Sequence, residues 1–366
     1  MARRENSRIS KRLPRGAEAM EARSVEALPR GPEWQYEPKW DGFRCLLARS
    51  REGITLRSKS GEDLTRYFPE LVEAAQRVKA PAFTIDGEIV VPDGEAFSFD
   101  ALLQRIHPAP SRIARLAKET PAVFVAFDLL AIGSTDLAVR PLATRRTELQ
   151  RFAKHFARDG RFRLSDVTTD ISVAKHWLAM AGGGFDGVIA KRVDLPYSAG
   201  SRDAMQKIKR YRSADCVIGG FRYAENKLKG RKVVGSLLLG LYDDDGLLHH
   251  VGFTSALKAA EKAELTEKLL THVTTRSFTG RTPGGPSRWS TRRSAEWQPV
   301  EPRYVVEVSY DHFTGGRFRH GTSILRWRPD KKPKQCRFDQ LAQKVVNPAS
   351  LLQPKPQAPK RIRSAA

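Results

Sequence analysis

The sequence predicts an α+β protein of two domains, in which a larger domain of strands and helices precedes a small β-barrel of the OB-fold type. The chain has 366 residues, which is more than one ordinary hydrophobic core accommodates. Up to about residue 212, short apolar runs bounded by Gly, Pro and Asp alternate with helical patterns. Beyond that point several strand-like runs surround a single helix, which is the pattern of a small closed barrel.

The first domain is expected over residues 25–212. Residues 1–24 are basic and poor in large apolar side chains, so we interpret them as a flexible segment. Apolar runs bounded by turn residues predict strands at 43–48, 54–56, 82–91, 123–130 and 187–190. Helices are predicted after the N-cap residue Ser98 and over residues 144–156 and 172–181, where a run of three glycines stops the last one.

The second domain is expected over residues 213–345. Its strands are predicted at 217–221, 235–242, 247–253 and 304–310, with one helix over 257–273. Residues 276–300 are rich in Ser, Thr, Gly, Pro and Arg and are interpreted as a loop. Residues 346–366 combine prolines with basic residues, lack an apolar period, and are predicted to be a disordered basic tail.

The charge of the chain points to a polyanionic partner. Lys and Arg number 64 against 41 Asp and Glu, a net charge of +23. Such a surplus is typical of proteins that bind the phosphate backbone of nucleic acids, although a surface of solvated lysines is the alternative. No run approaches the ~20 apolar residues of a membrane span, and the charged N-terminus is unlike a secretory signal, so a cytoplasmic protein without membrane contact is expected. The cysteines Cys45, Cys216 and Cys336 are too scattered for a disulfide framework or a cysteine zinc site.

The run Lys39-Trp40-Asp41-Gly42-Phe43-Arg44 is the first candidate for chemistry. A lysine becomes a nucleophile when a neighbouring cation or desolvation lowers its pKa. Gly42 permits a tight turn between strands, and the guanidinium of Arg44 can bind phosphate through two N–H groups. A lone lysine is more often a solvated side chain, so this motif needs support from others.

Acidic residues provide that support at two apolar strands. Asp86 and Glu88 close one apolar run, and burying two carboxylates is costly unless they bind something. Asp186 opens another run, and acids from separate strands can converge on a divalent cation. Taken alone, each Asp-Gly pair is equally consistent with a solvated turn.

Two basic segments complete the pattern. Strand alternation places Lys207 and Lys209 on one face, where they suit a triphosphate and can lower the pKa of a third lysine; a basic edge strand is the alternative. Residues 317–331 interleave arginines with aromatic residues, as expected of a strand that contacts phosphate or nucleic acid.

In this order and at these distances, the motifs resemble those of the ATP-dependent DNA ligases of the covalent nucleotidyltransferase superfamily. The similarity runs from about Glu33 to about Phe338 and is greatest to the small bacterial C-type ligases and the ligase module of the end-joining ligase D. The resemblance implies an adenylation domain of antiparallel sheets and helices, followed by the OB-fold domain, in a chain that acts as a monomer.

The resemblance also implies roles for residues around the nucleotide. Lys39 would be the residue that becomes adenylylated, and Glu37 would lie near the adenine. Phe127 would stack on the adenine, although a phenylalanine of the core is the alternative. Arg44 is the arginine of the lysine motif, and Arg57 matches an arginine that contacts ribose or phosphate.

Further roles concern the metal and the phosphates. The resemblance implies that Glu88 contacts ribose or metal and that Asp186 is associated with the metal. Lys207 and Lys209 would hold the α-phosphate. The C-terminal motif would orient pyrophosphate during the first step, through Arg326, Arg328, Asp330 and Lys331.

The expected reaction has three steps, with ATP as AMP donor and Mg²⁺ or Mn²⁺ as cofactor. Lys39 takes AMP from ATP, the AMP passes to the 5′-phosphate of nicked double-stranded DNA, and the 3′-hydroxyl then displaces it. The C-terminal domain is expected to swing between the steps. A role in DNA repair on the bacterial nucleoid is expected, with any polymerase, nuclease or end-binding protein supplied as a separate chain.

Two departures from the family pattern bear on the site. Many relatives have Glu where this chain has Asp186, so the shorter side chain would reach a metal through water. Many also have Trp-Leu where Met205 and Gln206 stand, which concerns local packing.

Other functions remain possible on the sequence. An NAD-dependent ligase would be longer and would carry a four-cysteine zinc site. An RNA ligase or a capping-type nucleotidyltransferase shares the lysine motif. A non-enzymatic alternative is a nucleic-acid-binding OB protein with an inactive transferase domain.

Overall fold

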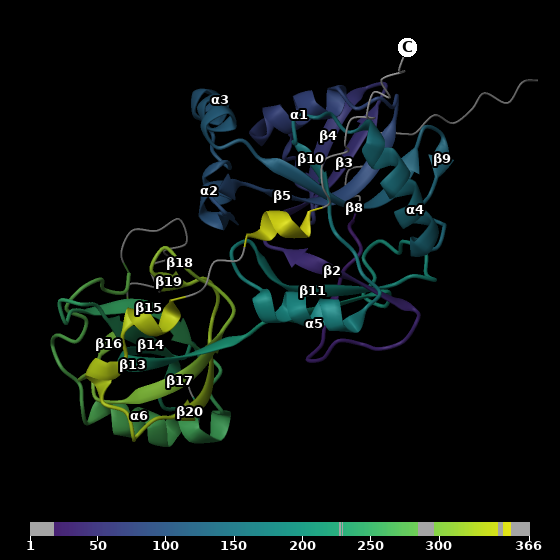
Figure 1. Cartoon of the computed structure of the whole chain (residues 1–366). Coiled ribbons are helices and arrows are strands. Elements are labelled where there is room, and N and C mark those ends of the chain that lie inside the picture. Colours follow the sequence, from purple (N-terminus) through teal and green to yellow (C-terminus); the bar gives the residue numbers. More distant parts are fainter. Residues whose placement is uncertain (1–17, 227, 229, 285–295, 343–346, 353–366) are drawn as a thin grey trace, which may run out of the picture. The chain divides into compact units, whose positions relative to one another are not determined.

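The computed structural model describes residues 18–226, 228, 230–284, 296–342 and 347–352. The chain forms two compact units (Figure 1). The N-terminal unit comprises residues 1–210 and 345–366, and the C-terminal unit comprises residues 211–344. The division falls two residues before the expected one because Arg212 already belongs to a strand of the C-terminal unit.

The N-terminal unit contains two larger sheets. In the first, the strands follow the order β10 (Phe162–Leu164), β8 (Val123–Ile132), β5 (Phe83–Val90), β3 (Phe43–Ser50) and β4 (Gly53–Ser58), and β9 (Thr135–Asp136) pairs with β8. In the second, the order is β1 (Arg23–Ser24), β12 (Met205–Lys209), β11 (Phe185–Arg192) and β2 (Trp34–Trp40). A two-stranded ribbon, β6 (Pro92–Asp93) and β7 (Ala96–Phe97), lies apart from both sheets. The longer neighbouring strands are antiparallel.

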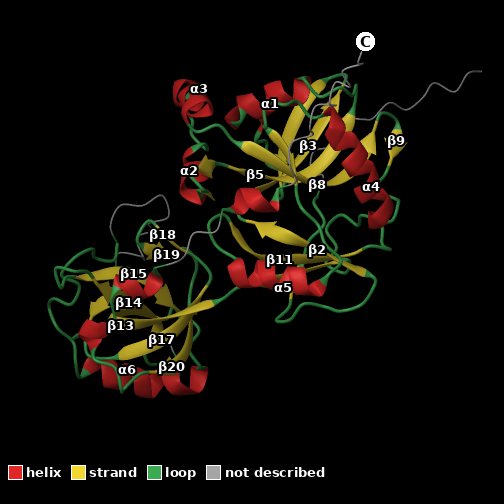
Figure 2. Cartoon of the chain, viewed as in Figure 1, coloured by secondary structure: helices red, strands yellow, loops and turns green. Residues whose placement is uncertain are grey.

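Helices accompany these sheets (Figure 2). They are α1 (Pro69–Gln76), α2 (Phe99–Gln104), α3 (Pro110–Glu119), α4 (Leu142–Phe152) and α5 (Ile171–Met180), with short 3₁₀ turns η1 (Thr65–Tyr67) and η2 (Ala153–His155). Ser98 caps α2 as predicted, because its side chain accepts a hydrogen bond from the Ala101 amide. The sequence reading missed α1 and α3, both of which begin at a proline in the first turn.

Each sheet has its own apolar core. The first core is built on the buried side chains of β3, β5 and β8, including Leu47, Phe83 and Phe124. The second contains Tyr36, Val188 and Ile208 from the three long strands of the second sheet. These strands therefore keep their apolar side chains inside and free their other face for polar side chains.

The C-terminal unit is built on one five-stranded antiparallel sheet. Its strands follow the order β15 (Leu248–Thr254), β14 (Val234–Tyr242), β13 (Arg212–Tyr223), β17 (Val305–Tyr310) and β20 (Ser323–Trp327), and β16 (Gln298–Pro299) pairs with β13. The two outer strands approach each other, because Thr254 at the end of β15 forms a bridge with Thr322 beside β20. A sheet closes into a barrel when its two edge strands meet, and this bridge brings the two edges together at one point.

Shorter elements complete the C-terminal unit. The predicted helix over 257–273 is η3 (Ala259–Glu261) followed by α6 (Lys262–Leu270). A small ribbon joins β18 (Phe313–Thr314) to β19 (Arg317–Phe318), and 3₁₀ turns η4 (Pro333–Gln335) and η5 (Phe338–Leu341) follow β20. The predicted loop over 276–300 is more ordered than expected where it is described, because Phe278 is buried in the core and β16 pairs with the sheet.

The predicted terminal segments differ from expectation in the parts that the structure describes. Before residue 25, Ala19 and Met20 are buried and β1 pairs with β12. After residue 346, η6 (Pro348–Leu351) lies on the N-terminal unit, where Leu351 and Leu352 enter the second core. The expectation of disorder was wrong for 347–352 because two adjacent leucines suffice to bury a short peptide without any helical or strand period. Residues 1–17 and 353–366 lie outside the described part.

Candidate active site

Three neighbouring strands of the second sheet bring the predicted lysines together. Gly187 on β11 lies opposite Lys39 on β2 and opposite Lys209 on β12. Residues opposite each other in an antiparallel pair share a face of the sheet. Gly187 carries no side chain, and a β-carbon there would come within 2.0 Å of the Ile208 carbonyl oxygen, so only glycine fits between the two lysines.

A β-bulge turns Asp186 toward the same face. Phe185 pairs with Trp40 and Gly187 with Lys39, which leaves Asp186 as the extra residue on β11. Its buried carboxylate forms ion pairs with Lys39 Nζ at 2.8 Å and with Lys209 Nζ at 3.2 Å. Regular alternation would have pointed Asp186 and Gly187 to opposite faces, so the bulge is what allows the acid to reach the lysine.

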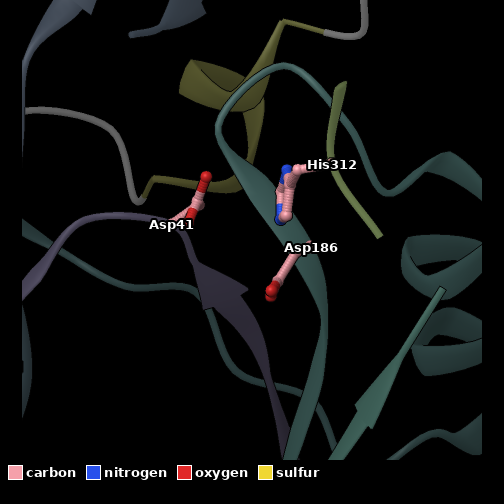
Figure 3. A group of neighbouring side chains, drawn as sticks. All are labelled: Asp41, Asp186 and His312. Atoms are coloured by element: carbon pink, nitrogen blue, oxygen red, sulfur yellow. The ribbon is translucent and has the colours of Figure 1, made fainter. Parts of the chain in front are cut away.

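A second acid lies beside Asp186. Asp41 follows β2, and one of its carboxylate oxygens lies within 4.8 Å of one from Asp186 (Figure 3). Two carboxylates at this spacing suit a hard divalent cation such as Mg²⁺ or Mn²⁺. The third side chain in Figure 3, His312, comes from the C-terminal unit, where its backbone N–H donates to Asp311 Oδ1.

Two residues further along the same strands, Ile189 on β11 lies opposite Glu37 on β2 and opposite Lys207 on β12. Burial and the nearby ammonium groups of Lys39 and Lys209 lower the pKa of Lys207. The Glu37 carboxylate accepts hydrogen bonds from Lys191 Nζ at 2.7 Å and from Gln35 Nε2 at 2.9 Å. Lys191 was missed as a site residue, although alternation from Gly187 through Ile189 would have placed it on this face.

The acids of β5 differ from each other in environment. Burial raises the pKa of Glu88 to about 8, while Lys39 and Arg44 oppose that rise and Asp41 adds to it. Its carboxylate accepts a hydrogen bond from the Gly42 amide at 3.1 Å. Asp86 instead accepts two hydrogen bonds from Arg44, at 2.9 and 2.7 Å, and one from the Tyr197 hydroxyl.

The expectation that Asp86 and Glu88 both face a ligand at a strand end was therefore wrong. Both residues lie inside β5, which extends to Val90, and residues two apart in a strand share a face. Glu88 lines the cavity described below, whereas the carboxylate of Asp86 is fully buried and is bound by Arg44 and Tyr197. Asp86 is instead the partner of Arg44, whose guanidinium is held by that carboxylate.

A cavity of about 400 Å³ connects most of these side chains. Of the predicted residues, it is lined by Glu37, Lys39, Arg44, Glu88, Phe127 and Lys207. The Phe127 ring is almost fully buried and carries two cations, Arg44 at 5.0 Å and Lys191 at 4.4 Å from its centre. Other lining residues that the sequence reading did not select include Lys59, Lys191, Arg202 and Met205.

Arg57 lies apart from this group. Its guanidinium donates to the Gly61 carbonyl oxygen, and it is absent from the cavity lining, whereas Lys59 two residues later is present. The predicted role of Arg57 at ribose or phosphate stays a prediction that the geometry does not favour.

The C-terminal motif forms its own network within the C-terminal unit. Arg328 binds Asp215 at 2.9 Å and Asp330 at 2.8 Å, and Lys331 binds Asp215 at 2.7 Å. Arg326 binds Glu307 at 2.7 Å. Internal acids thus hold these side chains in fixed positions, and their assignment to pyrophosphate stays a prediction.

Comparison with known proteins connects this geometry to a chemistry. The family described as "ATP dependent DNA ligase domain" matches residues 16–209, and "ATP dependent DNA ligase C terminal region" matches residues 230–331. Within the part of the chain that the structure describes, every helix is too short or too polar to cross a membrane.

Curated relatives agree with these matches. The chain is 43% identical to DNA ligase C2 of Mycolicibacterium smegmatis, over 88% of this chain and 93% of that protein. It is 42% identical to DNA ligase C of Mycobacterium tuberculosis, over 88% of this chain and 92% of that protein. It is also 31% identical to the multifunctional non-homologous end joining DNA repair protein LigD of M. tuberculosis, over 83% of this chain and 37% of that protein.

Proposed function

The chain belongs to the family of ATP-dependent DNA ligases and joins DNA strands using ATP, and we propose that Lys39 is the residue that carries AMP from the nucleotide to the DNA. The observation that carries the proposal is the buried Asp186 carboxylate, which holds Lys39 Nζ at 2.8 Å at the edge of a cavity of nucleotide size. A lysine fixed in this way is oriented for attack on a phosphate that enters the cavity.

The first step is a displacement at the α-phosphorus of ATP. Lys39 Nζ gives up a proton, for which the Asp186 carboxylate is in place, and forms a bond to phosphorus as the bond to pyrophosphate breaks. Lys207 and Lys209 neutralise charge on the phosphate oxygens. The strand register supports this role, because Lys209 lies in line with Lys39 across the sheet and Lys207 lies in line with Glu37.

A divalent cation fits the donors beside Lys39. Carboxylate oxygens of Asp41 and Asp186, with Glu88 in its ionised form, would hold Mg²⁺ or Mn²⁺, which would supply positive charge at the phosphates. Because the carboxylate of Asp186 already contacts two lysines, Asp41 offers a second oxygen ligand that the sequence reading did not include.

The later steps take place on DNA. AMP passes from Lys39 to the 5′-phosphate at a nick, and the 3′-hydroxyl then attacks that phosphate and releases AMP. The net charge of +23 supports binding of the duplex backbone. The C-terminal unit, with a five-stranded sheet whose edges meet at Thr254 and Thr322, is proposed to be an OB-fold barrel that contributes to this binding.

The cellular setting is inferred from the relatives. One of them is a multifunctional non-homologous end joining DNA repair protein, of which this chain matches 37%, so we propose a role in the repair of broken DNA. The substrate and the bacterial relatives support action on the nucleoid in the cytoplasm.

A labelling experiment tests the proposal. The protein is incubated with ATP, GTP or NAD labelled in the adenylyl or guanylyl group and with Mg²⁺, then run on a denaturing gel. We expect label from ATP on the wild type and none on Lys39→Ala. Absence of label from every donor would contradict the proposal.

A sealing assay then identifies the acceptor. Nicked duplexes with DNA or RNA on either side of the nick are offered to the labelled protein. Sealing of the all-DNA nick is expected, whereas transfer only to RNA ends would favour an RNA ligase or a capping-type enzyme.

A further inference from the structure

A cluster of three charged side chains in the cavity wall joins separate segments of the N-terminal unit. One carboxylate oxygen of Glu21 binds Lys59 Nζ at 2.7 Å, and the other binds Arg202 Nε at 2.6 Å. Lys59 directly follows β4 and Arg202 precedes β12, so the cluster connects the two larger sheets. All three side chains line the cavity that contains Lys39 and Lys207, yet none of them takes part in the steps described above.

The backbone that carries Glu21 is held in place by the fold. The Glu21 amide donates to the Ser201 carbonyl oxygen at 2.8 Å, and the Met20 amide donates to the Tyr197 hydroxyl at 2.9 Å. Met20 itself is buried, and the strand that follows, β1, pairs with β12. The Glu21 carboxylate is therefore brought to the cavity by a fixed backbone.

The two cations are held less firmly than the acid. The Lys59 side chain is 56% exposed and that of Arg202 is 67% exposed, against 22% for Glu21. Exposed ion pairs contribute little to stability, because water and salt screen them. Another anion can therefore take both cations from the Glu21 carboxylate at little cost, while the acid turns toward solvent.

A phosphate group suits the place that this carboxylate occupies. The guanidinium of an arginine matches the oxygens of carboxylate and phosphate alike, and a lysine binds either one as a point charge. The subsite also lies near the proposed α-phosphate lysine. Burial and two other lysines lower the pKa of Lys207 most, and the ammonium group of Lys59 adds to their effect.

We propose that Lys59 and Arg202 form a subsite for a second phosphate group beside the α-phosphate, and that the Glu21 carboxylate occupies this subsite until a substrate displaces it. The proposal rests on the proposed function. The phosphate comes either from the β,γ end of ATP or from the 5′ end of the nicked strand, since both enter this cavity in the reaction. Glu21 is then an internal competitor that weakens the binding of that substrate.

The competing explanation is that Glu21 only fastens the N-terminal segment to the rest of its unit. Loss of the charge would then lower stability and leave the affinity for every ligand unchanged or reduced. In the proposed role, loss of the charge raises the affinity for a ligand that carries the second phosphate. The two explanations therefore predict different signs for the same substitution.

The first experiment tests ATP as the source of the phosphate. Kd values for AMP and for α,β-methylene-ATP, which cannot release pyrophosphate, are measured by calorimetry with Mg²⁺. The wild type is compared with Glu21→Gln and with Glu18→Gln, which removes an exposed acid three residues earlier. If the subsite takes a phosphate of ATP, Glu21→Gln binds the methylene analogue about 3-fold more tightly than the wild type and binds AMP equally. Glu18→Gln is expected to bind both ligands as the wild type does.

The second experiment tests DNA as the source. The adenylylated protein is offered nicked duplexes with a 5′-phosphate or a 5′-hydroxyl at the nick, in EDTA, and binding is followed by fluorescence anisotropy. If the subsite takes the 5′-phosphate, the preference for the phosphorylated nick rises about 3-fold in Glu21→Gln and stays unchanged in Glu18→Gln. The ratio of the two Kd values cancels the general effect of net charge on DNA binding.

The variant Lys59→Met tests the subsite from the other side. Its side chain is exposed, so its loss is compatible with folding. It is expected to weaken by about 3-fold the binding of the ligand that Glu21→Gln strengthens. Lys79→Met, at another exposed lysine, is expected to change neither ligand.

A gain of affinity in either arm supports the subsite and identifies its source. Unchanged or weaker binding of both phosphate-bearing ligands in Glu21→Gln would overturn it. If thermal unfolding shows that Glu21→Gln does not fold, Lys59→Met decides, and wild-type affinity in both arms would then overturn the subsite. Absence of label on the wild type from ATP contradicts the proposed function, whereas normal labelling without a response to these variants rejects the subsite alone.

Discussion

Asp186 has two cationic neighbours, Lys39 and Lys209, and its carboxylate is buried between them. The two ammonium groups share this carboxylate, and the carboxylate of Asp41 lies beside it. Burial, and after it the same two ammonium groups, lower the pKa of Lys207.

The variant Asp186→Asn keeps the shape of the side chain and removes its charge. Lys39 then loses its counter-ion and its proton acceptor, and the lysines repel each other. The rate of transfer of labelled AMP to Lys39 is expected to fall by about 100-fold or more. Asp93→Asn, at an exposed residue of β6, serves as the control with unchanged rate. An unchanged rate in Asp186→Asn would contradict its role.

At the level of single residues, sequence patterns identified many of the residues that line the cavity. They did not identify contacts between residues that lie far apart in the chain. Strand alternation predicted the shared face of Lys207 and Lys209. Asp86 was misread because its partner Tyr197 lies 111 residues away in the chain. Lys191 was missed because a lysine near the end of a strand usually points into solvent, and only the tertiary fold brings Glu37 to it.

Among the elements, β11 does most to position the site, because its bulge and its glycine act together. Replacing Gly187 by Ala would place a β-carbon 2.0 Å from the Ile208 carbonyl oxygen, so the strands β11 and β12 must move apart. We expect the thermal midpoint to fall, with a loss of about 1–3 kcal/mol, and AMP transfer to fall further than stability alone explains. Gly321→Ala is the control, since its nearest neighbour would lie at 3.9 Å. Wild-type stability in Gly187→Ala would contradict the close approach.

The strand β15 carries a pH-sensitive group in the C-terminal unit. Burial, with Arg317, Arg222 and Arg281 adding repulsion, lowers the pKa of His250 to about 3. In the unfolded chain its pKa is about 6.5, so between these values the unfolded state binds the proton and the folded state does not. Stability is therefore unaffected above about pH 6.5 and falls as the pH decreases from there toward 3.

Hydrogen exchange of peptides from β14 and β15 measures this effect locally. Protection is expected to decline between pH 7 and pH 4 more steeply in the wild type than in His250→Gln, which has no ionisable ring, after correction for intrinsic exchange rates. Parallel pH profiles for the two proteins would show that His250 does not contribute.

Apolar runs in the sequence predicted where the strands lie along the chain better than they predicted which strands pair with each other. The run at 123–130 was recognised as a strand, and β8 indeed occupies Val123–Ile132. Its parallel pairing with β10 and the parallel pairing of β1 with β12 join segments far apart in sequence, which local patterns do not encode.

On the scale of the whole molecule, the chain passes from one unit to the other twice. After the C-terminal unit, residues 347–352 return to the N-terminal unit, where the Asp166 amide donates to the Leu351 carbonyl oxygen and both leucines are buried. Composition alone suggested a tail here, because prolines and basic residues surround the two leucines.

The variant Leu351→Ala tests the anchoring of this peptide. Leu351 is 4% exposed, so its truncation leaves a cavity in the second core of the N-terminal unit. The free energy of unfolding of that unit is expected to fall by about 2–5 kcal/mol, measured by chemical denaturation. Leu325→Ala, at a residue that is 56% exposed, is expected to change it little. Equal effects of the two substitutions would show that the peptide is not anchored.

Because residues 347–352 return to the N-terminal unit, we expect the protein to tolerate a break in the backbone between the two units. If the chain were cut between Arg210 and Tyr211, the fragment of residues 211–366 would still carry Leu351 and Leu352, whose binding site lies on the fragment of residues 1–210. The two pieces would then be expected to co-purify as a split protein, and removing residues 347–366 from the second piece would be expected to weaken their association.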